Sequence, residues 1–249
     1  MHTDHLGPFL DALGSLFWLE ITNKRWHANI AVGLKWLNEE LGRYHQATPN
    51  LGKVKLVASQ IRANDPGYPH LKVKAAQSKH LIAFGLALAV RHARGDATRP
   101  PFAFPTNGPH AESSEEYRTL VVECFSHLNA YVRAGDDEPF NKATCKGAIY
   151  GFLNAFDGLH VLFRRGVPEE NHAKLPWHLR PKCHLMQHEA EDQLGRWGPP
   201  RTAWCYKDES FMGAVKNIAA KSTHPRTLET VVLLKTQLLV GIEALQMAR

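Results

Sequence analysis

The chain has 249 residues, of which 44% are hydrophobic and 22% are charged. This length and apolar content suffice for the core of one large domain or two small ones, and they exclude a globally disordered chain. Lysine and arginine outnumber aspartate and glutamate by 30 to 24, which gives a formal net charge of +6 with the histidines neutral. Such a surplus is compatible with a nucleic-acid partner without establishing one. Histidine is unusually frequent, with 15 residues.

The cysteines and the N-terminus favour an intracellular protein. No CxxC pair occurs, so the sequence indicates neither a zinc ribbon nor a disulfide framework, and reduced thiols are expected. The cysteines are Cys124, Cys145, Cys183 and Cys205. The first ten residues lack the basic and apolar regions of a signal peptide. The most apolar stretch, 231–242, is interrupted by Lys235 and Gln237, so no membrane span is expected.

Hydrophobic residues recur with helical spacing along most of the chain. The expected fold is therefore mainly α, a bundle of about eight or nine helices with little or no sheet. Predicted helices cover 7–22, 26–46, 71–94, 140–165, 181–195, 208–221 and 225–247, and a further helix begins at Ser113. The second half of the helix at 71–94 is apolar on all sides, which predicts burial within the bundle. Residues 53–64 are ambiguous between a short helix and a strand.

A proline-rich stretch lies near the middle of the chain. Residues 96–112 include Pro100, Pro101, Pro105 and Pro109, which predicts a linker loop. The loop would separate an N-terminal helical subdomain, 1–95, from a C-terminal helical subdomain, 113–249. Directly after it, Ser113 and Glu116 have the spacing of a capping box at the start of a helix.

Residues with the capacity for chemistry concentrate between 182 and 216, and three interpretations stay open. The first is a metal site. His184 and His188 are four residues apart and therefore share one helix face, which is the spacing of many zinc ligands. Gln187 stands where the HExxH motif of metalloproteases has glutamate. The alternative is a helix with one half-buried and one exposed histidine.

The second interpretation is carboxylate chemistry on DNA. Asp208 and Glu209 are adjacent, so on a helix their side chains diverge by about 100° and do not share one ion comfortably. Glu209 and Lys216 are two helical turns apart on the same face, an arrangement that suits a metal-bound carboxylate with a lysine near a phosphate. The alternative is an acidic first turn favoured by the helix dipole.

The third interpretation is a basic and aromatic surface around the Pro199–Pro200 turn. Arginine and aromatic side chains on a rigid loop suit contacts with a nucleic-acid backbone or stacking on bases. These residues are Arg196, Trp197, Arg201, Trp204, Tyr206 and Lys207. The alternative is that the tryptophans pack the loop against the bundle.

The order of four short motifs resembles the C-terminal part of CACTA (En/Spm-like) DDE transposases and related mobile-element proteins. The motifs are MHTDHLG at 1–7, LKVKAAQSKH at 71–80, KCHLMQH at 182–188 followed by Gly198-Pro199, and WCYKDESFMG at 204–213 followed by Lys216. Gln77 and Ser78 replace the glutamate and tryptophan that the family favours. The likeness spans nearly the whole chain, although each motif is short.

The resemblance implies a role for individual residues. Glu209 corresponds to the third catalytic carboxylate of the family, Lys216 to a basic residue near DNA, and His184 and His188 to the histidines that precede the carboxylate. The family uses Mg²⁺ with three carboxylates to cleave and transfer DNA strands. Asp4 is the acid nearest to the place of the second carboxylate, so an incomplete active site and a fragment of a longer enzyme are expected.

Together these patterns predict a transposase-derived DNA-binding module. The predicted metal ligands are Glu209, Asp4, His184 and His188. The predicted DNA contacts are Lys182, Arg196, Arg201, Trp204, Tyr206, Lys207 and Lys216. Homo-oligomerisation stays open. Two alternative functions are a non-catalytic helical interaction protein and a small domain stabilised by Zn²⁺ on Cys183, His184, His188 and Cys205.

Overall fold

The computed structural model describes residues 7–48, 54–62, 67–97, 99–196 and 198–200. Within these ranges the chain forms helices and loops, and the only β-type pairings are two isolated bridges, Arg62 with His70 and Asp96 with Arg99. The mainly α fold class is therefore confirmed. The chain divides into two compact units, Met1–Trp204 and Cys205–Arg249, and every described residue belongs to the first.

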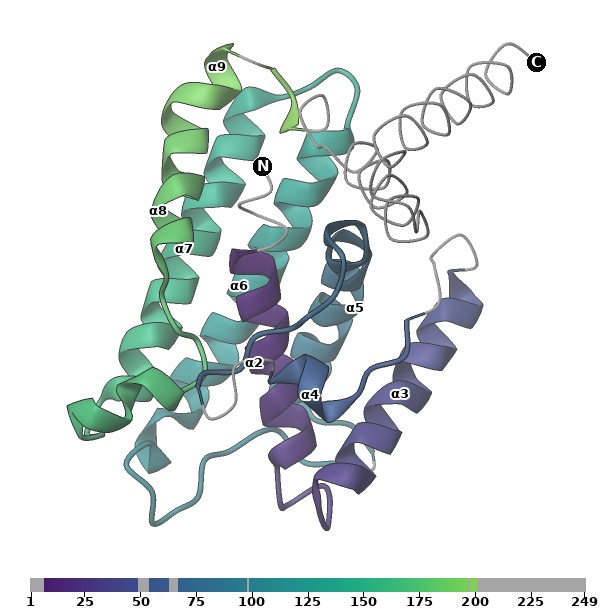
Figure 1. The fold of residues 1–249 in the computed structure, drawn as a ribbon, viewed down its shortest axis with the longest axis vertical. Helices are drawn as coiled ribbons and strands as arrows, with labels where there is room; N and C mark the ends of the chain where they lie inside the picture. The colour runs from purple at the N-terminus through teal and green to yellow at the C-terminus, as the bar shows by residue number, and fades with distance from the viewer. Residues whose placement is uncertain (1–6, 49–53, 63–66, 98, 197, 201–249) are drawn as a thin grey trace, which may run out of the picture. The chain divides into compact units, whose positions relative to one another are not determined.

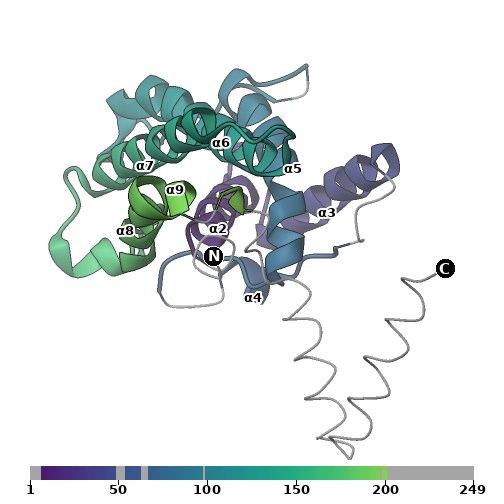
Figure 2. The same cartoon turned by 90° about the horizontal axis from the view of Figure 1, so that it is seen from above.

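Helix α2 (Pro8–Thr22) occupies the centre of this unit. Figure 2 shows it enclosed by the other helices. Its sequence, PFLDALGSLFWLEIT, is apolar on almost every side, and every residue from Pro8 to Phe17 is buried. The apolar half of α5 (Ala75–Arg94) was predicted to be buried all round, but Ala87 is exposed because α5 lies beside α2 rather than at the centre.

The long helices α6 (Ser114–Asp136) and α7 (Lys142–Arg164) form the other main layer. They pack along each other, and α5 packs against α6 (Figure 1). The contact faces are those that helical spacing predicts. Val121, Cys124 and Leu128 of α6 are fully buried, as are Ile149 and Phe152 of α7.

Helix α3 (Ile30–Ala47) begins four residues later than predicted. The Asn29 side chain accepts a hydrogen bond from the Val32 amide and so caps the helix there. The ambiguous region resolves into an extended segment, 54–57, and one helical turn, α4 (Ala58–Ile61). Both lie on the side of α2 that α3 also covers (Figure 1).

The proline-rich loop runs from the end of α5 to a short 3₁₀ turn, η1 (Ala111–Ser113). Phe102 and Phe104 of this loop are buried in the core. The predicted capping box is wrong: Ser113 precedes α6 but makes no side-chain cap. Instead, the neighbouring Ser114 hydroxyl accepts a hydrogen bond from the Phe104 amide and ties the loop to the helix. The subdivision into 1–95 and 113–249 stays a prediction.

Beyond α7 the chain forms the 3₁₀ segment η2 (Glu169–Lys174) and then a continuous helical run. The run consists of α8 (Pro181–His188), the π-helical turn η3 (Glu189–Gln193) and α9 (Leu194–Arg196), and it is called the 181–196 helix below. It packs against α7. Among the described residues no helix is long and apolar enough to cross a membrane.

Candidate functional site

The 181–196 helix has a buried side and a solvent-facing side. Cys183, Met186 and Leu194 point into the core, together with Glu189 and Ala190. The residues that the sequence singled out lie outside the core: His184, His188 and Arg196 are exposed, and Lys182 is partly exposed. Pro181 occupies the first turn, where its missing N–H costs no hydrogen bond. The helical spacing thus brings His184 and His188 to one face, whereas Lys182 and His184, two residues apart, point about 160° away from each other.

The two histidines of this surface contact each other. Their Nε2 atoms are 3.0 Å apart, and the rings meet edge to face. Two ligands of one Zn²⁺ ion at about 2.0–2.1 Å each lie about 3 Å apart, so the pair has the separation of a two-point chelate. No described group of three or more histidine, cysteine or acidic residues is arranged to hold a metal ion.

Cys183, a member of the alternative zinc set, does not join the histidines. Its side chain lies on the buried side of the helix, and burial raises the pKa of its thiol to about 11. A thiol with so high a pKa is protonated at neutral pH and is a poor ligand and nucleophile. Of the three described members of that set, the structure brings together only His184 and His188.

The π-helical turn directs two glutamates to different environments. The buried Glu189 accepts a hydrogen bond from the Tyr131 hydroxyl of α6 at 2.8 Å. The exposed Glu191 accepts hydrogen bonds from Gln187 at 2.9 Å and from Tyr150 of α7 at 3.2 Å. The hydrogen bond from Gln187 is the main cause of a lowered Glu191 pKa. These bonds fix the helix on α6 and α7 beside the histidine pair.

A buried carboxylate anchors the start of the helix. Asp11 of α2 accepts a hydrogen bond from Arg180 Nε at 2.7 Å and one from His70 Nδ1 at 2.6 Å. Sequence patterns did not indicate this contact, because Asp11, His70 and Arg180 lie far apart in the chain. The one sequence signal that could have found it is an acid in the apolar first half of α2.

Trp177 holds the segment that leads into the helix. Its ring is fully buried, and its backbone has a φ of +56°, a conformation that bulky residues rarely adopt. The Trp177 amide donates to the Ser15 hydroxyl at 2.8 Å, and its carbonyl accepts from Arg164. Burial lowers the pKa of the Arg164 guanidinium to about 10. Contacts from α2 and α7 therefore maintain the strained residue.

A second buried network joins α2, α5 and α6. His92 lies between Glu20 and Tyr117, with Nδ1 at 2.9 Å from the Glu20 carboxylate and Nε2 at 2.9 Å from the Tyr117 hydroxyl. Arg99 also donates to Glu20 at 3.2 Å and stacks over Trp36. Burial raises the Tyr117 pKa well above its usual value, so the phenol keeps its proton. Glu20, His92 and Tyr117 are buried, and the network cross-links the core.

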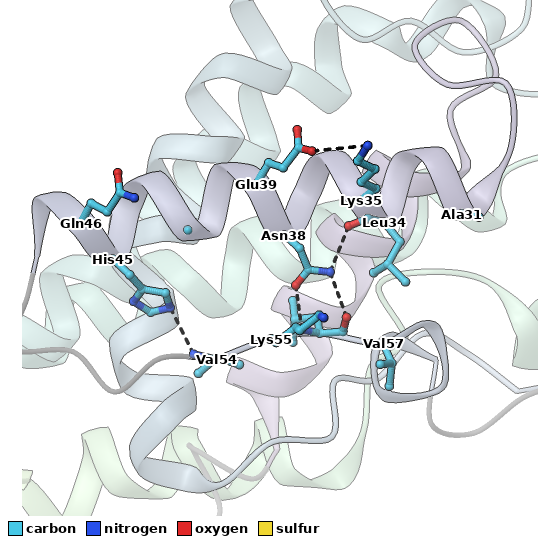
Figure 3. A pocket seen from close by; sticks show the side chains of 12 residues that line it. Ala31, Leu34, Lys35, Asn38, Glu39, His45, Gln46, Val54, Lys55 and Val57 are labelled. Carbon is cyan, nitrogen blue, oxygen red and sulfur yellow. Dashed lines mark hydrogen bonds and ion pairs between the residues drawn. The ribbon is translucent and has the colours of Figure 1, made fainter.

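A groove of about 930 Å³ lies between α3 and the extended segment 54–57 (Figure 3). The Asn38 amide holds Leu56 at two points, donating to its carbonyl at 2.9 Å and accepting from its N–H at 2.8 Å. His45 accepts a hydrogen bond from the Val54 amide. These side chains replace a neighbouring strand and keep the segment beside the helix.

The other predicted site residues lie outside the described ranges. They are Asp4, Arg201, Trp204, Tyr206, Lys207, Glu209 and Lys216. Their predicted roles stay predictions, as does the contribution of Cys205 to a zinc site. Comparison with protein-family models, curated proteins and solved structures found no match to the chain.

Proposed function

We propose that the chain is a DNA-binding module related to the C-terminal part of CACTA-type DDE transposases. One observation carries the proposal: the described residues predicted to bind DNA or metal, Lys182, His184, His188 and Arg196, are all exposed or partly exposed on one anchored helix. Cationic side chains held on a rigid helix can contact phosphates without a large ordering cost. The order of the transposase-like motifs supports the same function.

Neighbouring charges add to this surface. Lys142 of α7 reaches Gly195, where a β-carbon would lie 2.8 Å from its Nζ atom. Lys146, on the next turn of α7, lies over the Tyr150 ring. With Lys182 and Arg196 these make four cationic side chains, against three exposed acids of the same two elements, Asp157, Glu191 and Asp192. The net positive charge favours a polyanion as partner.

A salt series of DNA-shift assays tests the proposal. We expect wild-type protein to retard duplex DNA at about 20–50 mM salt, and the affinity to fall steeply as salt rises. Replacing two phosphate contacts in Lys182→Gln/Arg196→Gln should lower the slope of log K against log salt by about 2. Arg94→Gln/Arg133→Gln, which removes two exposed arginines from α5 and α6, is the matched control. An absence of retardation at low salt would refute DNA binding and favour the interaction-protein alternative.

Strand cleavage is a separate question from DNA binding. Glu209 and Asp4, the predicted metal carboxylates, lie outside the described residues, so a cleavage activity has the family resemblance as its only support. Supercoiled plasmid incubated with the protein and Mg²⁺ or Mn²⁺ tests it directly. Nicking that Glu209→Gln abolishes would extend the proposal to DNA cleavage, whereas nicking that persists in this variant would remove Glu209 from the proposed site.

A second candidate function is binding of a divalent transition metal, favoured by the 3.0 Å separation of His184 and His188 Nε2. Replacing one histidine converts a two-point chelate into a single imidazole contact. We therefore expect His188→Ala to weaken Zn²⁺ or Ni²⁺ binding about tenfold or more, measured by equilibrium dialysis. His80→Ala, at an exposed position of α5, should leave the affinity unchanged. Equal affinities in the two variants would exclude the pair as the site.

The cellular setting belongs to the same proposal. Cys124 and Cys183 are buried free thiols, as in proteins of reducing compartments. This supports an intracellular location, and DNA binding in a eukaryote would place the protein in the nucleus. Sedimentation velocity on the full chain, with and without DNA, would show whether it acts as a homo-oligomer.

A further inference from the structure

A cleft of about 650 Å³ opens between two loops at one end of α2. One wall is the turn that follows α2, with Lys24 and Arg25. The other wall is the loop after α5, with Phe102, Phe104 and Asn107. Sequence patterns did not indicate this cleft, because its walls come from segments almost eighty residues apart.

Hydrogen bonds preform both walls, to α5 and α6 in one wall and within the turn in the other. The Phe102 amide donates to the His92 carbonyl at 2.9 Å, and the Phe104 amide donates to the Ser114 hydroxyl at 3.0 Å. In the opposite wall the Trp26 amide donates to the Asn23 carbonyl at 3.0 Å. A loop site supported in this way can bind a ligand without first being ordered.

The chemistry of the lining is asymmetric. Leu19 and the two phenylalanines make an apolar floor, and the Phe102 ring stacks on His92 at 4.5 Å. Lys24 and Arg25 are exposed, and neither forms an ion pair with a described residue. No aspartate or glutamate lines the cleft. The charge therefore fits an anion, and the floor fits a flat apolar group.

We propose that this cleft binds a nucleoside monophosphate unit, either as a free nucleotide or at the end of a DNA strand. The base would lie over the apolar floor, where aromatic side chains contact bases without regard to sequence. The phosphate would contact Lys24 and Arg25 through charge-assisted hydrogen bonds. The Asn107 amide, at the exposed rim, offers both a donor and an acceptor to a base edge. No residue of the 181–196 helix lines the cleft, so the nucleotide-site proposal can be tested independently of the proposed DNA-binding function.

Calorimetric titration of the full chain with AMP, adenosine and inorganic phosphate tests the proposal. We expect AMP to bind about tenfold or more tightly than either fragment alone, because each fragment lacks one half of the contacts. Lys24→Gln/Arg25→Gln should weaken AMP binding by about tenfold or more and leave adenosine unaffected. Arg94→Gln/Arg133→Gln, with two exposed arginines away from the cleft, should bind AMP as the wild type does.

A second variant locates the ligand. Ala103 lines the cleft and is only partly buried, so Ala103→Leu should fill space at the floor and weaken both AMP and adenosine. Thermal melts by circular dichroism establish that each variant is folded. AMP that binds no more tightly than adenosine, or equally to wild type and Lys24→Gln/Arg25→Gln, would overturn the proposal.

The source of the nucleotide unit follows from one further comparison. A 5′-phosphorylated single-stranded oligonucleotide that binds more tightly than AMP, and loses affinity in Lys24→Gln/Arg25→Gln, identifies a strand end. Stronger binding of AMP identifies the free nucleotide. Lys182→Gln/Arg196→Gln should leave AMP binding unchanged, and a loss of AMP binding in that variant would overturn a separate site.

Discussion

At the scale of single residues, buried acids hold distant parts of the chain together. Asp11 and Glu20 lie within the apolar α2, and each has an arginine and a histidine as partners. Charged groups in a core are stable only when paired in this way. Sequence spacing predicted that α2 is a helix, but it did not predict these partners, because contacts between residues so far apart depend on the tertiary fold.

Removing one partner of a buried carboxylate should lower the free energy of unfolding. Arg180→Met leaves Asp11 with His70 alone, so we expect the free energy of unfolding to fall by about 3 kcal/mol, measured by urea denaturation. Arg165→Met is the matched control, because Arg165 and its partner Glu116 are both about half exposed (54% and 48%). Surface pairs of this kind contribute about 0–1 kcal/mol. Equal losses in the two variants would contradict a special role for Asp11.

At the scale of elements, periodicity predicted helix existence better than helix ends. Apolar residues at helical spacing identified α2, α6 and α7, since packing against a core selects for that spacing. The predicted start of α3 was wrong because the Asn29 side chain caps that helix locally, and the predicted cap of α6 was wrong because Ser113 makes no side-chain cap. In the site, the shared face of His184 and His188 was predictable from their spacing. The burial of Cys183 was not, because it depends on how the helix packs in the fold.

Two glycines of α3 should respond to the same substitution in opposite ways. At Gly33 a β-carbon would lie 2.5 Å from the Ile21 carbonyl oxygen of α2, whereas at Gly42 no atom lies within 4 Å. We expect Gly33→Ala to destabilise the protein by about 1–3 kcal/mol through overpacking. Gly42→Ala should stabilise it by about 0.5–1 kcal/mol, because alanine favours a helix.

Chemical denaturation of both glycine variants provides the comparison. Each is the same change in the same helix, so helix propensity is matched and only the contact with α2 differs. Destabilisation by Gly42→Ala, or a neutral Gly33→Ala, would contradict the close packing of α3 on α2.

At the scale of the whole molecule, the histidine content acquires a structural explanation. Many of the described histidines cross-link segments: His45 holds the extended segment 54–57, His92 joins α2 to α6, and His160 accepts a hydrogen bond from the Leu179 amide. Composition alone could not predict that histidines cross-link segments, because the same residue type also serves as a metal ligand and as a surface charge. The exposed pair, His184 and His188, is therefore distinct in its setting from the histidines of the core.

The core histidines make stability depend on pH. Burial is the largest cause of a lowered pKa at His27, His110, His160 and His178, and nearby arginines lower it further. The unfolded chain, with histidine pKa values near 6.5, takes up protons at a higher pH than the folded protein does. The contribution of these histidines to the free energy of unfolding is therefore fully present above about pH 6.5. It decreases as the pH falls through that value.

Thermal melts between pH 7.5 and 5.5, above the range in which carboxylates titrate, measure this dependence. We expect the melting temperature to fall on acidification, by about 2–4 °C for each 1 kcal/mol of lost stability. His178→Gln keeps an acceptor for the Arg164 guanidinium, which bonds to His178 Nδ1 at 3.1 Å, but removes one titrating group. Its melting temperature should therefore fall less than that of the wild type over the same interval. A wild-type melting temperature that stays constant or rises on acidification would show that the buried imidazoles do not control stability, because their lowered pKa values permit a change of one sign only.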